Sequence, residues 1–190
     1  MAKVQKKKTK QKKSIKKKFF PVESKLTSTK IKLYSTTPEK LEGKVIKIDL
    51  TKILRGKSFE LKLKVINKEE KLTTSPTSLQ LTQSYVKKTV RKGTDYSEDS
   101  FEVDTKDSKI RVKPLLITRK RVSRLILKVL RENTKKEITD YMKIRSTNEI
   151  FSDIISNKLQ KSLSIKLKKI YPLALSEIRA IKVISNIQKQ

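Results

Sequence analysis

The chain has 190 residues, with 49 Lys or Arg against 19 Asp or Glu, so its formal net charge is +30, and it contains no His or Cys. Without those two residue types it has no imidazole base, no thiolate nucleophile, no disulfide and no zinc site built from the usual ligands. The charge excess predicts lasting contact with a polyanion, because each neutralised phosphate releases condensed counterions.

Short ligand-binding motifs and targeting signals are also missing from the sequence. The three glycines, Gly43, Gly56 and Gly93, are isolated from one another and do not form a phosphate-binding loop or a dinucleotide fingerprint. No apolar run reaches the roughly 18 residues that predict a membrane-spanning helix. The basic N-terminus lacks the apolar stretch of a secretory signal. We therefore expect no cofactor, no metal, no small-molecule substrate and no membrane partner.

The first 18 residues contain ten lysines and no acidic residue. A block of like charges cannot pack on itself, so we expect residues 1–18 to be disordered or extended when free and to act as an RNA-binding arm that orders on contact. A solubilising or nuclear-localisation tail is the alternative. The arm residues expected to bind RNA are Lys6, Lys7, Lys8, Lys12, Lys13, Lys16, Lys17 and Lys18.

Residues 19–190 are expected to form a single α+β domain that binds RNA and begins with a short apolar plug at residues 19–22. Alternating apolar and charged residues predict strands at 44–50 and 58–66, joined as a hairpin with a longer loop. The stretch 67–80 is harder to assign, because Pro76 should interrupt any regular element.

A short helix is predicted at residues 81–92, with Gly93 as the left-handed residue that follows its C-terminus. Cations in the last turns of a helix favour the negative end of its dipole, but this helix carries more of them than capping requires. We interpret the excess as a basic surface for phosphates. Its members are Lys87, Lys88, Arg91 and Lys92.

Residues 95–107 reverse the sign of the charge, with six carboxylates and one cation, Lys106. Such a segment would repel phosphate, so we expect it to face solvent or a basic partner protein, and a metal site is the weaker alternative. Strands are predicted from 101 and over 109–118, with a tight turn at 107–108 between them. Pro114 indicates an edge position or a bulge in the second strand.

The clearest amphipathic pattern lies at residues 119–131, which we predict to be helical. One arc of this helix is apolar and expected to be buried, and it comprises Val122, Leu125, Ile126, Val129 and Leu130. The opposite arc is cationic, which favours phosphate contact over a merely solvated face. The candidate RNA-binding residues of the segment are Arg119, Lys120, Arg121, Arg124, Lys128 and Arg131.

The C-terminal third of the chain continues the α+β pattern. Residues 133–145 are a polar continuation with weaker periodicity. One long helix is predicted from Thr147, a candidate N-cap, to the Tyr-Pro pair at 171–172, because apolar residues recur there at helical spacing. A final strand at 175–184 returns to the sheet.

Four strings of this sequence resemble the archaeal and eukaryotic small-subunit ribosomal protein family known as eS-one, or S-three-Ae. They are LEGKVIKIDL at 41–50, LTQSYVKKTVRKG at 81–93, VDTKDSKIRVKPLLITRKR at 103–121 and IYPLALSEIRAIKV at 170–183. The chain departs from the family pattern at 105–108, where TKDS replaces T-K-D-G, and at 19–20, where two phenylalanines replace a tryptophan. It also lacks the C-terminal extension of eukaryotic members, which indicates an archaeal-sized protein.

The resemblance implies a small β-barrel-like, mostly antiparallel sheet flanked by about three helices. It also implies a structural role in the cytoplasmic ribosome, on the platform of the small subunit. There the protein would bind small-subunit rRNA near its 3′ end and the mRNA exit, touch neighbouring platform proteins and lie close to mRNA. Lys and Arg contacts to phosphate would supply position and affinity more than base specificity.

Two other functions remain open from the residues alone. Charge and tail would also suit an architectural DNA-binding or chromatin protein. An RNA-processing enzyme would have to rely on carboxylates such as Asp99, Glu102 and Asp104, which lie in the most phosphate-repelling segment, so we expect no enzymatic activity. The five Phe, five Tyr and no Trp argue against a single-strand binder built on stacking platforms.

Overall fold

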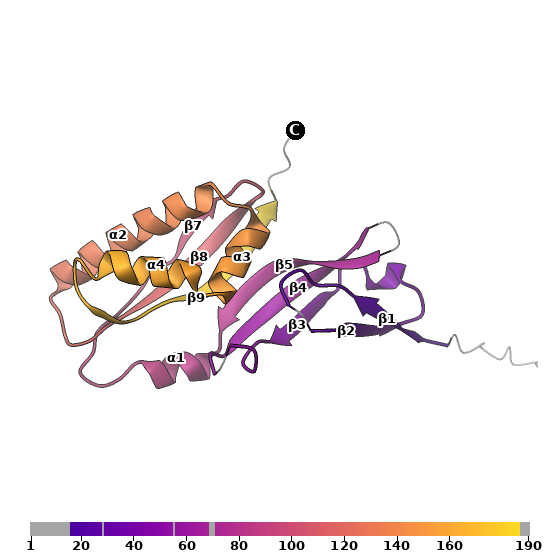
Figure 1. Ribbon diagram of the computed structural model, residues 1–190, viewed down its shortest axis with the longest axis horizontal. Helices are drawn as coiled ribbons and strands as arrows, with labels where there is room; N and C mark the ends of the chain where they lie inside the picture. The colour runs from indigo at the N-terminus through magenta and orange to yellow at the C-terminus, as the bar shows by residue number, and fades with distance from the viewer. Residues whose placement is uncertain (1–15, 28, 55, 69–70, 187–190) are drawn as a thin grey trace, which may run out of the picture.

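The computed structural model describes residues 16–27, 29–54, 56–68 and 71–186, and it is an α+β fold with antiparallel strand pairing, as predicted (Figure 1). Lys6, Lys7, Lys8, Lys12 and Lys13, which we predicted to bind RNA, lie outside the described residues. The main sheet has seven strands in the order β3 (Val45–Asp49), β4 (Phe59–Lys68), β5 (Lys71–Leu81), β9 (Leu173–Asn186), β8 (Ser108–Thr118), β6 (Tyr96–Glu98), with β7 (Phe101–Asp104) also paired to β8.

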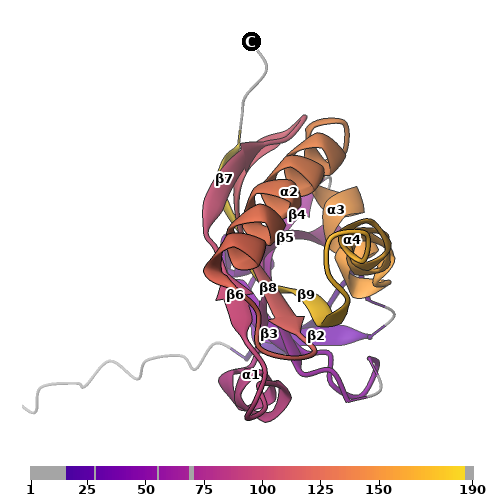
Figure 2. The ribbon, with the colours of Figure 1, turned by 90° about the vertical axis from the view of Figure 1, so that its left-hand side faces the viewer.

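The main sheet is open rather than barrel-like. Within the described residues, no pairing joins β3 at one edge to β6 or β7 at the other. Helices, instead of strand closure, cover the apolar face: α2 (Arg124–Lys143) contacts β7, α3 (Thr147–Ile155) contacts β5, and α4 (Lys158–Leu167) contacts β9 (Figure 2). The core between the two layers is apolar and includes Leu61, Ile110, Ile138, Phe151 and Ile181.

The short helix α1 (Gln83–Thr89) follows β5 and lies beside the sheet, apart from the three-helix layer (Figures 1 and 2). The short helix predicted there is confirmed, but Gly93 is not the residue that ends it. The helix stops at Val90, which is extended, and Gly93 takes its positive φ of 81° in the turn that follows.

A two-stranded sheet of β1 (Lys18–Val22) and β2 (Ile31–Ser35) lies at the end of the molecule far from α2 (Figure 1). It packs on the end of the β4–β5 hairpin through a second apolar cluster that contains Val22, Val65 and Leu72. The cluster also takes in Leu41, from the 3-10 helix η1 (Glu39–Leu41). The apolar plug predicted at 19–22 is therefore half right, because only its inward residues are buried.

Both prolines of the main sheet, Pro76 and Pro114, lie at bulges. Pro76, which we expected to break regular structure, lies inside β5, and that expectation is wrong. The β4–β5 register shifts between Lys62 and Leu63, and β9 pairs with β5 only at residues 78–80, so the missing amide of the proline is tolerated. Pro114 lies at a register shift between β8 and β9 and between the segments paired to β7 and β6, so a bulge is confirmed and an edge position is wrong.

The helix predicted at 119–131 begins later and faces a different way. Ser123 is the N-cap of α2, and its hydroxyl accepts a hydrogen bond from the Ile126 amide at 3.4 Å. The preceding turn is held by Asp95, whose carboxylate accepts from the Val122 amide at 2.8 Å. The buried stripe of the helix comprises Leu130, Thr134, Ile138 and Met142.

Two residues that we placed in the buried arc of this helix are instead exposed. Leu125 is 75% exposed and Val129 41% exposed. The error came from starting the helix too early: the stripe was fitted to the first turns, whereas packing against the sheet is made by the later ones. The polar stretch predicted at 133–145 is the continuation of the same helix.

The long helix predicted from Thr147 is broken in two. Its N-cap is Ser146, one residue earlier, in a capping box with Glu149. Asn157 adopts a left-handed conformation with φ 60° between α3 and α4, and Asn is among the few side chains that tolerate it. The Gln160 side chain donates to the Ile154 carbonyl at 3.0 Å, and the same carbonyl accepts from the Asn157 amide at 3.1 Å, so both sides of the break are hydrogen-bonded to one group. Apolar spacing alone did not reveal this kink.

The β7–β8 turn closes without glycine. The Thr105 hydroxyl donates to the Ser108 carbonyl at 2.7 Å and accepts from the Ser108 amide at 3.1 Å. The buried Ser108 hydroxyl also lies 2.7 Å from the hydroxyl of Thr147 at the start of α3. The serine of TKDS therefore ties the turn to the helical layer.

In the described parts of the chain, none of the helices is both long and apolar enough to cross a bilayer.

Candidate nucleic-acid interface

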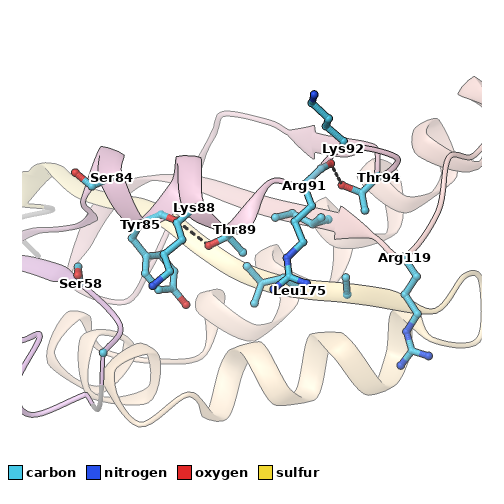
Figure 3. Close-up of a pocket in the computed structure, with 13 residues that line it drawn as sticks. Ser58, Ser84, Tyr85, Lys88, Thr89, Arg91, Lys92, Thr94, Arg119 and Leu175 are labelled. Atoms are coloured by element: carbon cyan, nitrogen blue, oxygen red, sulfur yellow. Dashed lines mark hydrogen bonds between the residues drawn. The ribbon is translucent and has the colours of Figure 1, made fainter.

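A hollow of about 700 Å³ opens between α1, the loop before β4, and the ends of β8 and β9 (Figure 3). Two of the cationic clusters predicted from sequence meet in it, although the strands β6, β7 and β8 lie between them along the chain. Lys88, Arg91 and Lys92 come from α1 and the turn after it, and Arg119 comes from the end of β8. Among the residues that the structure describes, no carboxylate lines the hollow.

The cations of the hollow, which we call the basic hollow, do not all point the same way. Figure 3 shows the charged ends of Lys88, Arg91 and Arg119 on one side, while the Lys92 side chain extends away from them. Within the described residues, none of the four forms an ion pair with an acidic side chain. Three guanidinium or ammonium groups therefore face solvent around one concave surface with their charge uncompensated.

The backbone beneath these cations is fixed by threonine hydroxyls. Thr89 donates to the Tyr85 carbonyl at 2.7 Å in the last turn of α1, and Thr94 donates to the Arg91 carbonyl at 2.7 Å in the following turn. The first is the bond to the i−4 carbonyl that threonine often makes within a helix, and the second closes the turn that follows, where the Arg91 carbonyl also accepts from the Thr94 amide at 3.4 Å. They hold the Lys88–Arg91 region in one conformation, so the cations are presented from an ordered support.

The floor of the basic hollow is apolar and rests on a buried ion pair. Tyr85, Ile117 and Leu175 line it. Burial, and secondarily the charge of Glu177, raises the pKa of Tyr85 above its ordinary value. Glu177 is itself 4% exposed and pairs with Lys57, and the Lys57 ammonium donates to the Asn157 side chain at 2.9 Å. This pair joins the loop before β4 to β9 and to the α3–α4 break.

The remaining predicted cations lie outside the basic hollow. Lys87 is exposed on α1, Lys120 and Arg121 are exposed in the turn before α2, and Arg124 and Lys128 are exposed on α2. Arg131 lines a separate depression together with Glu98, Asp99 and Lys113, so it lies apart from the cations of the basic hollow and has carboxylates close by. The cations predicted to form one helical face at 119–131 are thus distributed over the basic hollow, the turn before α2, the exposed side of α2 and a separate depression.

Of the arm residues, Lys16, Lys17 and Lys18 are described. All three are exposed, Lys18 is the first residue of β1, and the Lys17 ammonium lies 5.6 Å from the centre of the Tyr34 ring. They lie at and just before the start of β1, and none of them lines the basic hollow.

Comparison with known proteins identifies the family of this chain. The model of the Ribosomal S3Ae family matches residues 4–186. The chain belongs to that family. Three archaeal relatives, each named small ribosomal subunit protein eS1, are similar to it. The protein of Nanoarchaeum equitans is 31% identical over 75% of this chain and 74% of its own length.

The other two relatives match more weakly or over less of the sequence. The protein of Pyrobaculum arsenaticum is 29% identical over 79% of this chain and 70% of its own. That of Methanothermobacter thermautotrophicus is 31% identical over 52% of this chain, and the chain spans about half of that relative's length. The resemblance predicted from the four local strings is confirmed at the level of the family.

In this S3Ae-family chain the acidic segment is partly neutralised within the fold. Glu98 pairs with Arg179 of β9, and Glu102 pairs with Arg111 at 2.7 Å and Lys109 at 3.0 Å on β8. We expected this segment to face solvent or a partner, and Glu102, Asp104 and Asp107 are indeed exposed, but the ion pairs give Glu98 and Glu102 a structural use as well. Within the described ranges, no group of acidic side chains is arranged to hold a metal ion.

Sequence reasoning missed the polar and aromatic members of the basic hollow. Ser58, Ser84 and Tyr85 line it beside the cations. Tyr85 was assigned to the apolar stripe of the helix and is indeed half-buried there, but one side of it also borders the hollow. Because Ser58 comes from a loop distant in sequence, no local pattern could have indicated its place in the site.

Proposed function

We propose that this chain is a structural constituent of the small ribosomal subunit and that it binds small-subunit rRNA through the basic hollow. Membership of the Ribosomal S3Ae family and the printed names of its relatives support the ribosomal role. The observation that supports rRNA binding is the convergence of Lys88, Arg91 and Arg119 on one concave surface without a carboxylate. Such a surface suits a folded RNA, because several of its backbone phosphates can contact the cations of one concave surface.

The finer placement follows from the family resemblance. The protein would lie on the platform of the subunit, near the rRNA 3′ end and the mRNA exit, in contact with neighbouring platform proteins and close to mRNA, within the cytoplasmic ribosome. Residues 1–18 would act as an arm that enters rRNA, and residues 19–190 as the rRNA-binding domain. The role is structural and requires no catalytic group or cofactor.

Sedimentation of a lysate of the source cells tests the ribosomal role. We expect this chain, followed by mass spectrometry, to migrate with small subunits and to remain there at moderate salt. Migration with chromatin would contradict the proposal and favour a DNA-binding function, and so would migration near the top of the gradient.

Two double variants with equal loss of charge test the basic hollow. Arg91→Ala with Arg119→Ala removes two uncompensated cations, whereas Lys109→Ala with Arg111→Ala removes two cations paired to Glu102. Each phosphate contact contributes about 0.9 to the slope of log K against log salt on a duplex-like scale, so the first variant should flatten the slope for small-subunit rRNA by about 1.8.

The second double variant is the control and should change that slope by less than about half as much, because its cations are already neutralised. Equal slopes for the two variants would mean that binding follows net charge alone. The assignment of the basic hollow would then be wrong, even if the chain still migrates with the small subunit.

A further inference from the structure

The outward face of the β1–β2 sheet carries two exposed aromatic rings side by side. Phe19 and Tyr34 are register partners on the antiparallel strands, with ring centroids 4.9 Å apart and planes inclined by 42°. Phe19 is 68% exposed and Tyr34 55% exposed. The same strands turn Phe20, Val22 and Leu33 inward onto the second apolar cluster, so the sheet is anchored without using the outer rings.

The charged residues next to this aromatic pair in the sequence are all cations. Lys16, Lys17, Lys18 and Lys32 are all exposed, and residues 16–22 and 30–35 contain no Asp or Glu. The Lys17 ammonium lies 5.6 Å from the centre of the Tyr34 ring, within the range of a cation–π contact. The surface therefore combines exposed π faces with positive charge and has no compensating carboxylate within those two segments.

An unpaired nucleotide has the matching chemistry, with a flat base to stack on a ring and a phosphate to meet a lysine. Stacking on strand-borne aromatics, with cations along the backbone path, is how many proteins hold single-stranded RNA. A duplex does not fit such a surface, because its bases are already stacked on one another. A purely acidic protein segment would match the lysines but would leave the two rings exposed.

We propose that Phe19 and Tyr34 form a stacking platform for unpaired bases of RNA, with Lys17 and Lys32 as its phosphate contacts. The proposal rests on the proposed function, since it adds to an rRNA-binding protein a second site that selects unpaired nucleotides. It also revises the sequence-based expectation against stacking platforms: few aromatics are needed when two of them are adjacent and exposed. The basic hollow and the platform would then hold different kinds of RNA, structured backbone and single strand.

The absence of tryptophan from the chain allows a direct optical test. Phe19→Trp in the full chain places a single indole on the platform, and its fluorescence should be quenched when a short single-stranded RNA oligonucleotide binds. The same oligonucleotide annealed to its complement should quench it far less at equal phosphate concentration. An indole that stays unquenched while the single strand is bound would overturn the proposal and would point to a protein occupant of this face.

Affinity measurements give a second, independent result. Phe19→Leu with Tyr34→Leu keeps an apolar surface but removes both π faces, and it should weaken binding of the single-stranded oligonucleotide about tenfold while leaving the duplex within about twofold. The control is Leu125→Ala with Ile165→Ala, which changes two similarly exposed apolar residues away from the platform and should change neither affinity. Unchanged melting temperatures of both variants show that folding is intact.

Failure of the platform can be told apart from failure of the proposed function. If the Leu double variant binds single-stranded RNA normally while small-subunit rRNA binding still depends on Arg91 and Arg119, the platform alone is wrong. If the chain does not migrate with small subunits at all, the proposed function is wrong, whatever the fluorescence shows.

Discussion

The basic hollow and the strand face around Glu102 contain the same kinds of cation but use them differently. On the strand face, Arg111 and Lys109 both pair with Glu102, and nearby Arg179 pairs with Glu98. In the basic hollow, no carboxylate is among the lining residues. The number of cations in a segment therefore does not by itself predict a surface that is free to bind phosphate. What matters is whether the fold supplies each cation with a partner.

A third arrangement lies directly beneath the basic hollow. Lys57 sits between two residues that line it, Gly56 and Ser58, but its ammonium is turned inward to the buried Glu177. Neighbouring basic residues thus serve opposite purposes: Lys57 stabilises the fold, whereas Lys88 and Arg91 remain available to a ligand. Stability and RNA affinity should respond separately when these residues are changed.

The largest effect on stability is expected for Lys57→Met. Removing the ammonium leaves the buried Glu177 carboxylate without its cation, and the Gln160 side-chain amide at 3.4 Å is the one side-chain donor that remains to it among the described residues. Breaking one partner of a buried ion pair typically costs about 3 kcal/mol or more. Lys57 is partly exposed, which places the expected loss at the low end of that range. Urea denaturation followed by circular dichroism measures the change in free energy of unfolding.

The matched control for this prediction is Lys47→Met, which breaks an exposed pair with Glu60 at 2.9 Å. Surface pairs contribute about 0–1 kcal/mol, so this variant should remain close to the parent protein. If both methionine variants lose the same stability, the Lys57–Glu177 pair is not the structural support of the floor that we describe.

A smaller effect on the free energy of unfolding is expected to distinguish the cations around Glu98 and Glu102 from those of the basic hollow. Arg179→Ala should lower the free energy of unfolding by about 1 kcal/mol, because it removes a half-buried pair that links β9 to β6 across β8. Arg91→Ala and Arg119→Ala should each stay within about 0.5 kcal/mol, since neither side chain is paired. Thermal or urea melts of the three variants check this order, and a destabilised Arg91→Ala would mean that the basic hollow is structural rather than free for a ligand.

Much of the sheet was predictable because strand patterning is local. Alternation at 58–66 and 109–118 gave strands close to the observed bounds, and the family strings gave the fold class. The errors have physical causes that periodicity does not contain. A bulge tolerates Pro76, a left-handed Asn157 breaks one helix into two, and Asp95 holds the turn that delays α2. Each depends on a contact with a residue outside the local pattern.

The candidate site was predictable in its residue types but not in its arrangement. The sequence indicated the cations near Lys88 and near Arg119, yet only the pairing of β6 with β8 brings the two segments to one surface. The helical wheel placed Arg131 with them, whereas the structure places it beside Glu98 and Asp99. Charge partners are decided by tertiary contacts, so a cation's availability could not be read from its neighbours in the chain.

The smallest expected effect is a change in the pKa of Glu102, on the strand face where Arg111 and Lys109 pair with it. Hydrogen bonds from Arg111, and then from Lys109, hold the pKa of Glu102 below its ordinary value of 4.5. Because the folded-state pKa is lowered, the pairs stabilise the folded protein above the ordinary pKa, and this contribution disappears as the pH falls through the folded-state pKa. A carboxyl titration followed by NMR should show the lowered pKa, and Arg111→Ala should return it toward 4.5 by more than Lys109→Ala does.

Asp49 is the internal control for this titration. Its pKa is also lowered, but chiefly by hydrogen bonds from the Thr51 hydroxyl and amide rather than by cations. High salt screens exposed charges, so it should reduce the shift of Glu102 while leaving that of Asp49 nearly unchanged. If salt moves neither pKa, the pairing of Arg111 and Lys109 with Glu102 is not maintained in solution. The cations of that face would then be as available to phosphate as those of the basic hollow, and the contrast between the two regions would fail.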